Sequence, residues 1–148
     1  MEPTREKETP INQTATILVR AEATAGRLAL VETIERHHAE PPCHRHHWED
    51  KLLYVLDGEL AFFLGGDWQI VPAGQAVFVP RGVEHTFTVL SDTARLLVIF
   101  TPAGFESFYQ DIHENLALDK HKTSVERWVT AAARYGCEVT GPHPGRPV

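Results

Sequence analysis

The chain contains no long apolar run. No stretch of its 148 residues approaches the roughly 20 apolar residues that a membrane helix requires, so we expect no membrane partner. The N-terminal segment 1–10 is charged and lacks the apolar core of a signal peptide, which indicates a cytoplasmic location. The chain has only two cysteines, Cys43 and Cys137, and in a reducing compartment we expect both to be free thiols.

Positive charge is also scarce. The formal net charge is −6 at pH 7, and no cluster of Lys and Arg offsets it, which argues against a nucleic-acid partner. A GxSxG nucleophile elbow and a phosphate-binding glycine loop are absent as well. The remaining composition, 43% hydrophobic and 23% charged, is typical of one globular domain.

Short β-type segments recur between turn signals over residues 15–100. Asp57-Gly58 is a hairpin signal between two of these segments. No helical period occurs before residue 100, so alternation of strands with helices is not expected. Such regular spacing predicts an all-β sandwich or barrel. The expected strands are 16–20, 28–34, 51–56, 59–64, 68–71, 75–79, 85–90 and 94–100.

Helical periodicity begins after the expected barrel. One apolar stripe consists of Phe105, Phe108, Tyr109, Ile112 and Leu116. A second helix is expected to begin at a Thr123/Glu126 capping box and to end at Gly136. Its expected apolar face is Val125, Trp128, Val129, Ala132 and Tyr135. We expect both helices to pack outside the barrel or across one of its mouths.

These patterns divide the chain into three parts. We predict a flexible N-terminal arm over residues 1–14, a barrel over 15–102 and a C-terminal helical extension over 103–148. A free sheet edge together with the arm indicates a homodimer.

Histidines are concentrated in residues 42–51. On extended backbone, side chains two residues apart point to the same side, so His44 and His46 can direct two ring nitrogens at one point. This pattern predicts a metal site that needs a third ligand from elsewhere in the chain. His47 faces the opposite side, whereas Glu49 or Asp50 are candidate substitute ligands.

Two motifs about forty residues apart resemble those of the cupin superfamily. The first reads His44-Arg-His46, four residues, Lys51, six residues and Gly58. The second reads Gly74, five residues, Pro80-Arg-Gly82, two residues and His85, with Val89 where the family has Asn. The segment Thr101-Pro-Ala-Gly-Phe105 is similar to a bacterial branch called quercetin dioxygenase-like. This resemblance implies a cupin jelly-roll barrel with any metal inside it.

The resemblance also assigns ligand positions. His44, His46 and His85 take the three histidine positions, and Lys51 stands where the family has a glutamate ligand. A lysine ammonium cannot donate to a metal and repels one at close range, so ligation would require a large depression of its pKa. Imidazole suits Fe, Ni, Cu and Zn alike, so the histidines do not select the metal.

Three functions are compatible with this departure from the family. The first is a metal-dependent dioxygenase, and the second is a metal-independent cyclase or isomerase of natural-product biosynthesis in which Lys51 acts beside His44 and His85. The third is a non-catalytic barrel that binds a small molecule. In each case we expect a mid-sized aromatic or polyketide-like ligand. The expected contacts are Trp48, Leu53, Phe62, Phe78, Phe87 and Phe105.

Overall fold

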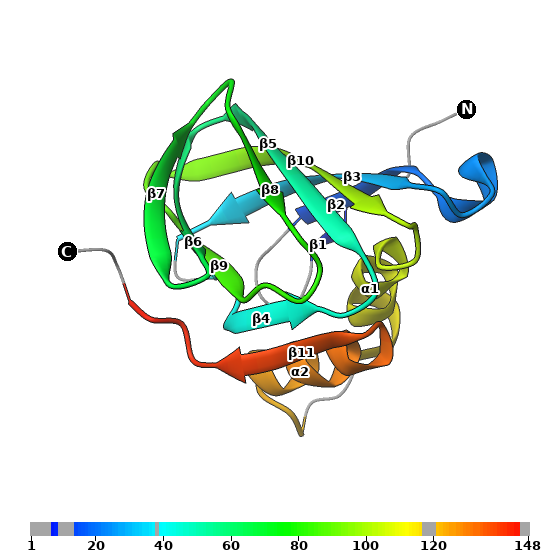
Figure 1. Ribbon diagram of the computed structural model, residues 1–148. Coiled ribbons are helices and arrows are strands. Elements are labelled where there is room, and N and C mark those ends of the chain that lie inside the picture. Colours follow the sequence, from blue (N-terminus) through cyan, green and yellow to red (C-terminus); the bar gives the residue numbers. More distant parts are fainter. Residues whose placement is uncertain (1–6, 9–13, 38, 117–120, 146–148) are drawn as a thin grey trace.

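Two antiparallel sheets face each other and enclose the core (Figure 1). The computed structural model describes residues 7–8, 14–37, 39–116 and 121–145. One sheet has the spatial order β1 (Lys7–Glu8), β2 (Thr14–Val19), β3 (Ala29–Arg36), β10 (Thr93–Thr101), β5 (Asp50–Asp57) and β8 (Ala76–Val79). The other has the order β11 (Cys137–Gly141), β4 (Cys43–His46), β9 (His85–Val89), β6 (Glu59–Leu64) and β7 (Asp67–Pro72). The all-β jelly-roll prediction is confirmed.

Side chains alternate between the inside and the outside along each strand, and the inward-facing apolar ones fill the interior. On β5, Leu53 and Val55 are buried, while Leu52 and Tyr54, which alternate with them, are exposed. The same phase runs through the neighbouring strand β10, and the two inner faces meet in one continuous core. Full burial of each large apolar side chain contributes about 1.5–3 kcal/mol, so this core is the main stabilising element of the barrel.

The C-terminal segment adds two helices below the barrel (Figure 1). α1 (Glu106–Asp111) continues into a π-helical segment, Ile112–Leu116, and α2 (Ser124–Arg134) begins at the predicted Thr123/Glu126 capping box. Neither of these described helices has the length and apolar character needed to cross a membrane.

The apolar face predicted for α2 is partly wrong. Trp128, Ala131 and Ala132 are buried, whereas Val125 and Val129 are exposed. The helix is therefore rotated about its own axis, by about one residue position, relative to the orientation that its apolar residues alone indicate. The stripe centred on Trp128 faces the barrel, and the two valines lie on its solvent side.

The sequence analysis missed the last strand. After Gly136 the chain returns as β11 and pairs antiparallel with β4, placing Cys137 opposite His46 and Val139 opposite His44. The C-terminal extension is thus joined directly to the strand that carries two of the candidate ligands. Most of the predicted arm, residues 1–14, lies outside the described residues; within it, Lys7 pairs with Ala15.

Gly136 fixes the turn between α2 and β11. Its φ is +70°, and a Cβ at this position would collide with the indole ring of Trp48. The carbonyl oxygen of Gly136 also accepts a hydrogen bond of 2.9 Å from the backbone N–H of His47. Trp48 therefore covers this turn from outside.

We expect Gly136→Ala to destabilise the protein more than Gly74→Ala does. Gly74 also has a positive φ, +88°, but a Cβ there meets nothing within 4 Å. Gly74→Ala should therefore cost about 1–2 kcal/mol for the left-handed backbone alone. Gly136→Ala should cost a further 1–3 kcal/mol, approximately, from the overlap with Trp48. Urea unfolding of the three proteins measures the difference, and equal losses would show that Trp48 does not constrain this turn.

Candidate metal centre

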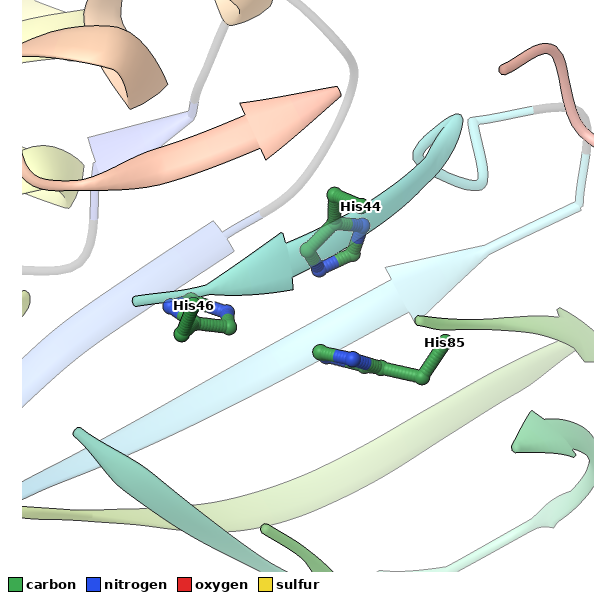
Figure 2. Close-up of side chains that lie close together, drawn as sticks. All are labelled: His44, His46 and His85. Carbon is green, nitrogen blue, oxygen red and sulfur yellow. The ribbon is translucent and has the colours of Figure 1, made fainter. Parts of the chain in front are cut away.

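Three histidines converge inside the barrel (Figure 2). His44 and His46 lie on β4, and His85 begins β9 directly opposite His44 in the strand pairing. One ring nitrogen from each residue lies within 4.8 Å of the other two. Their relative exposures are 2%, 2% and 0%, so solvent does not reach them.

Two of the rings are oriented by backbone carbonyls. The Nδ1–H of His44 donates to the carbonyl oxygen of Pro42 at 2.8 Å, and the Nδ1–H of His85 donates to that of Val83 at 3.0 Å. A carbonyl oxygen can only accept, so the proton must be on Nδ1 in each ring. Nε2 of each ring therefore carries a lone pair, the form of imidazole that binds a metal, and that of His85 also lies within hydrogen-bond distance of Lys51 Nζ.

The third ring is oriented by a carboxylate. With Glu49 ionised, the Nδ1–H of His46 donates to Glu49 Oε1 at 2.6 Å, and both side chains are buried. Nε2 of His46 is buried and has no hydrogen-bond partner among the residues that the structure describes. Leaving such an atom unpaired costs about 1–3 kcal/mol. A divalent metal at the point where the three Nε2 atoms converge would satisfy it, so the residues present fit the metal that the fold implies.

Burial keeps the three rings neutral. Burial and, to a lesser extent, the nearby charge of Lys51 together lower the pKa of His44 from 6.5 to about 3. Burial likewise lowers the pKa values of His46 and His85 well below 6.5, with Lys51 again contributing. Neutral imidazole is the state that coordinates a metal, so no proton has to leave these rings at neutral pH.

Lys51 occupies the position expected from its place in the motif. It lies on β5 with 6% relative exposure, and its Nζ is 3.4 Å from Nε2 of His85. Burial lowers the pKa of Lys51, while electrostatic interactions with Cys137, Glu35 and Glu49 act in the opposite direction. Lys51 therefore loses its proton at a lower pH than a surface lysine does, and its amine lies next to the candidate metal centre.

Neither neighbouring carboxylate replaces the missing ligand. Glu49 is hydrogen-bonded to His46, and burial raises its pKa to about 7. Asp50 accepts the backbone N–H of Arg81 at 2.9 Å and also pairs with the Arg81 guanidinium. The expectation that either residue substitutes as a ligand is not met, because both are committed to other partners.

A narrow cavity adjoins the centre. Three of the predicted contacts, Leu53, Phe87 and Phe105, line it together with Lys51, and so do His44 and His46. Its volume is about 30 Å³, which is room for about one water molecule. A mid-sized organic molecule therefore does not fit in this conformation. The C-terminal helices contribute Phe108, Tyr109 and Trp128 to the wall of this cavity.

Aromatic side chains of the C-terminal segment form part of the cavity wall, and of these only Phe105 was predicted as a site residue. Phe105 contacts His46 edge-on with ring centroids 4.4 Å apart, and Trp128 contacts His44 at 4.9 Å. Phe108 and Tyr109 of α1 also line the cavity. The helical stripe in the sequence contained this signal, but periodicity alone does not distinguish packing on a barrel wall from closing its mouth.

Three predicted contacts lie elsewhere. Phe78 is 55% exposed, because Val77 and Val79 on β8 face inward and alternation turns Phe78 outward. Trp48 is 58% exposed, because β4 ends at His46 and the alternation does not continue to residue 48. Phe62 is buried behind His85, with the two rings stacked at a centroid distance of 6.0 Å, and it supports the centre without lining the cavity.

The fold and the histidine geometry together define a cupin. Residues 30–100 match the family model described as Cupin domain. The chain belongs to the cupin superfamily, and these residues form its cupin domain. The quercetin dioxygenase-like branch stays a prediction.

Individual proteins resemble this chain over parts of its length. An uncharacterised protein of Streptomyces coelicolor is 38% identical over 56 residues, which are 38% of this chain and 53% of that protein. The match thus spans about half the length of this curated relative. An RmlC-like cupin from Shewanella frigidimarina has a TM-score of 0.61 and 23% identity, covering 70% of this chain and 88% of the other. The polyketide cyclase RemF from Streptomyces resistomycificus has a TM-score of 0.55 and 28% identity, covering 68% and 72%.

The free energy of unfolding of chelator-treated protein should fall as the solution is acidified. Below pH 6.5 the unfolded chain binds a proton at His44 that the folded chain excludes down to about pH 3. This removes up to about 1.4 kcal/mol per pH unit, and His46 and His85 act in the same direction. Glu49 acts oppositely between pH 4.5 and about 7, because its pKa is raised, but it is one group against three.

Urea unfolding at about pH 7.5 and about pH 5.5 tests this dependence. The double variant His44→Gln/His85→Gln should lose stability less steeply with acidification than the unaltered protein. The exposed His47, replaced by Gln, serves as the matched control and should leave the dependence unchanged. An equal dependence in all three proteins would contradict the assignment.

Proposed function

We propose that this cupin is an enzyme acting on a carbonyl-bearing, polyketide-like or aromatic small molecule. In this proposal His44, His46 and His85 hold a divalent transition metal such as Fe, Ni, Cu or Zn. Lys51 transfers a proton or donates to a developing oxyanion next to it. The reaction class is a cyclisation or isomerisation that begins with removal of a proton α to a carbonyl.

The unpartnered Nε2 of His46 carries the proposal. Two rings are fixed by backbone carbonyls and the third by Glu49, and all three present an Nε2 lone pair to one buried point. A purely structural histidine cluster gains nothing from leaving a buried nitrogen unpaired, whereas a ligand set requires it. When bound, the metal would supply Lewis-acid polarisation of a carbonyl oxygen.

Lys51 supports acid–base chemistry at the same place. Its Nζ lies at the wall of the cavity, 3.4 Å from Nε2 of His85, and the rest of that wall is mostly apolar, which limits the access of water. An amine held in such surroundings can accept a proton from carbon or donate one to oxygen. The usual glutamate ligand could not serve as a cationic donor here, so the substitution favours proton transfer.

The similarity to a polyketide cyclase agrees with this class of substrate. RemF is 28% identical over a matched region that covers 68% of this chain. The aromatic cavity wall, Phe87, Phe105, Phe108 and Trp128, suits a flat conjugated molecule.

The histidine set itself favours a second candidate, O₂-dependent oxidation, since three neutral imidazoles leave coordination positions open. Oxygen consumption during substrate turnover distinguishes this candidate from the first. The homodimer and the cytoplasmic location stay predictions of the sequence.

Metal content tests the centre. Protein purified without chelator should carry close to one equivalent of a transition metal per chain, and His46→Gln or His85→Gln should reduce it to less than about a tenth. His47→Gln should leave it unchanged, because His47 faces away and bonds Glu138. Elemental analysis by mass spectrometry gives the count. Less than about a tenth of an equivalent in the unaltered protein would exclude the metal-dependent forms of the proposal.

Exchange of carbon-bound protons tests Lys51. In D₂O the enzyme should accelerate exchange of the acetyl protons of 6-hydroxy-2-acetonaphthone, observed by NMR. Lys51→Met should slow this by about 10²–10⁴-fold while retaining the metal, because the proton acceptor is lost and the ligands remain. Lys122→Met, just before α2, is the control and should not change the rate. An unchanged rate in Lys51→Met would remove Lys51 from the mechanism.

A further inference from the structure

The outer face of the larger sheet is apolar, although the outer face of an antiparallel sheet is commonly polar. On β5, Leu52 and Tyr54 point away from the core and are 36% and 39% exposed. On the neighbouring edge strand β8, Phe78 is 55% exposed. Antiparallel sheets with one face in water usually present polar residues on that face. Large apolar side chains that lie together there indicate a surface that another molecule covers.

The strand register joins these side chains into one continuous surface. Residues directly opposite each other on antiparallel strands lie side by side on the same face. One row crosses four strands and is entirely apolar: Leu30, Ile99, Leu52 and Phe78. The next row, two residues further along each strand, has a single charged member: Glu32, Leu97, Tyr54 and Ala76. We call these two rows, together with the exposed Leu56 of β5, the outer-face patch.

The outer-face patch has the dimensions of a small protein interface. Four strands spaced about 4.8 Å apart, and three outward positions along β5, give a footprint of roughly 20 Å by 20 Å. A flat footprint of about 400 Å² per molecule places the contact at the lower end of the range for specific interfaces. We therefore expect association in the micromolar range, because area and affinity are only loosely related.

Charge favours a second copy of this chain as the molecule that covers the patch. Each chain carries a net charge of −6, so two copies repel each other except where they meet through a surface without excess charge. The patch is such a surface, because Arg95 of β10 donates to Glu32 through two hydrogen bonds of 2.8 and 3.1 Å. A strongly charged protein or an anionic membrane gains no electrostatic attraction from this neutralised pair.

We propose that two copies of the chain pack their outer-face patches together in a two-fold symmetric dimer. Two-fold symmetry brings the same patch to both sides of the contact, so apolar rows meet apolar rows. Phe78, which the sequence analysis assigned to ligand binding, is an interface residue in this dimer. The interface is a sheet face, and thus differs from the free edge and N-terminal arm that the sequence indicated. It does not depend on the proposed function.

Sedimentation-velocity ultracentrifugation of the full-length protein tests the dimer. Between about 0.5 and 100 µM, the 16.6 kDa chain should change from monomer to dimer, with a dissociation constant in the micromolar range. Tyr54→Lys should raise this constant at least about 100-fold, because each copy then brings a like charge into the contact. Tyr54 is the diagnostic position, because β5 lies inside the sheet and an edge-to-edge dimer would not contact it.

Ile70→Lys is the matched control. Ile70 is as exposed as Phe78, at 55%, but it lies on β7 of the other sheet, so its replacement should change the dissociation constant less than about twofold. If urea unfolding shows that Tyr54→Lys does not fold, Tyr54→Thr takes its place. Threonine suits a strand and removes the aromatic ring, so the dissociation constant should rise about tenfold.

Two results would overturn the proposal. One is an unaltered protein that stays monomeric at about 100 µM, and co-sedimentation of that monomer with neutral phosphatidylcholine vesicles would assign the patch to a lipid surface instead. The other is a dimer of unchanged strength in Tyr54→Lys, or in the Tyr54→Thr that replaces it, which would place the contact on another surface.

Discussion

The pairing of β4 with β9 is the constraint on which the site depends. It places His44 directly opposite His85, so two ligands from distant parts of the sequence share one inner face. Each ring is then locked by the carbonyl oxygen two residues before it, that of Pro42 or of Val83. The same local arrangement thus occurs twice and directs two Nε2 atoms inward without help from other side chains. His46 lacks such a carbonyl and uses Glu49 instead, which makes Glu49 a positioning residue of the centre.

Charge balance explains why Lys51 is tolerated beside this centre. Replacing a glutamate ligand by lysine changes the local charge by two units, and burial raises the cost of the remaining cation. Glu35 and Glu49 are both buried near Lys51, and their charges favour its protonated form. Burial lowers the pKa of Lys51 and the two carboxylates raise it, and these opposing effects make proton exchange at Lys51 feasible. A surface lysine would have no comparable reason to change its protonation state.

The sequence predicted the barrel and the convergence of the three histidines, because strand spacing and two motifs fixed both. Of the aromatic contacts that it predicted, Phe87 and Phe105 line the cavity, whereas Trp48, Phe62 and Phe78 do not. Phe78 and Phe87 have similar patterns, and only the phase of each strand in the closed barrel turns one outward and the other inward. Glu35 was missed because a single carboxylate near the end of a predicted strand carries no motif. β11 was missed because five residues after a helix give too little alternation to indicate pairing with β4.

The C-terminal segment completes the site as well as covering it. β11 joins the strand of His44 and His46, while Phe105 and Trp128 close on their rings. The account therefore predicts a buried metal enclosed by both parts of the chain. Anomalous X-ray diffraction from crystals of the protein tests this most directly. The account predicts one strong peak equidistant from the Nε2 atoms of His44, His46 and His85. Well-ordered histidines with no peak between them, or with Lys51 Nζ occupying that point, would contradict it.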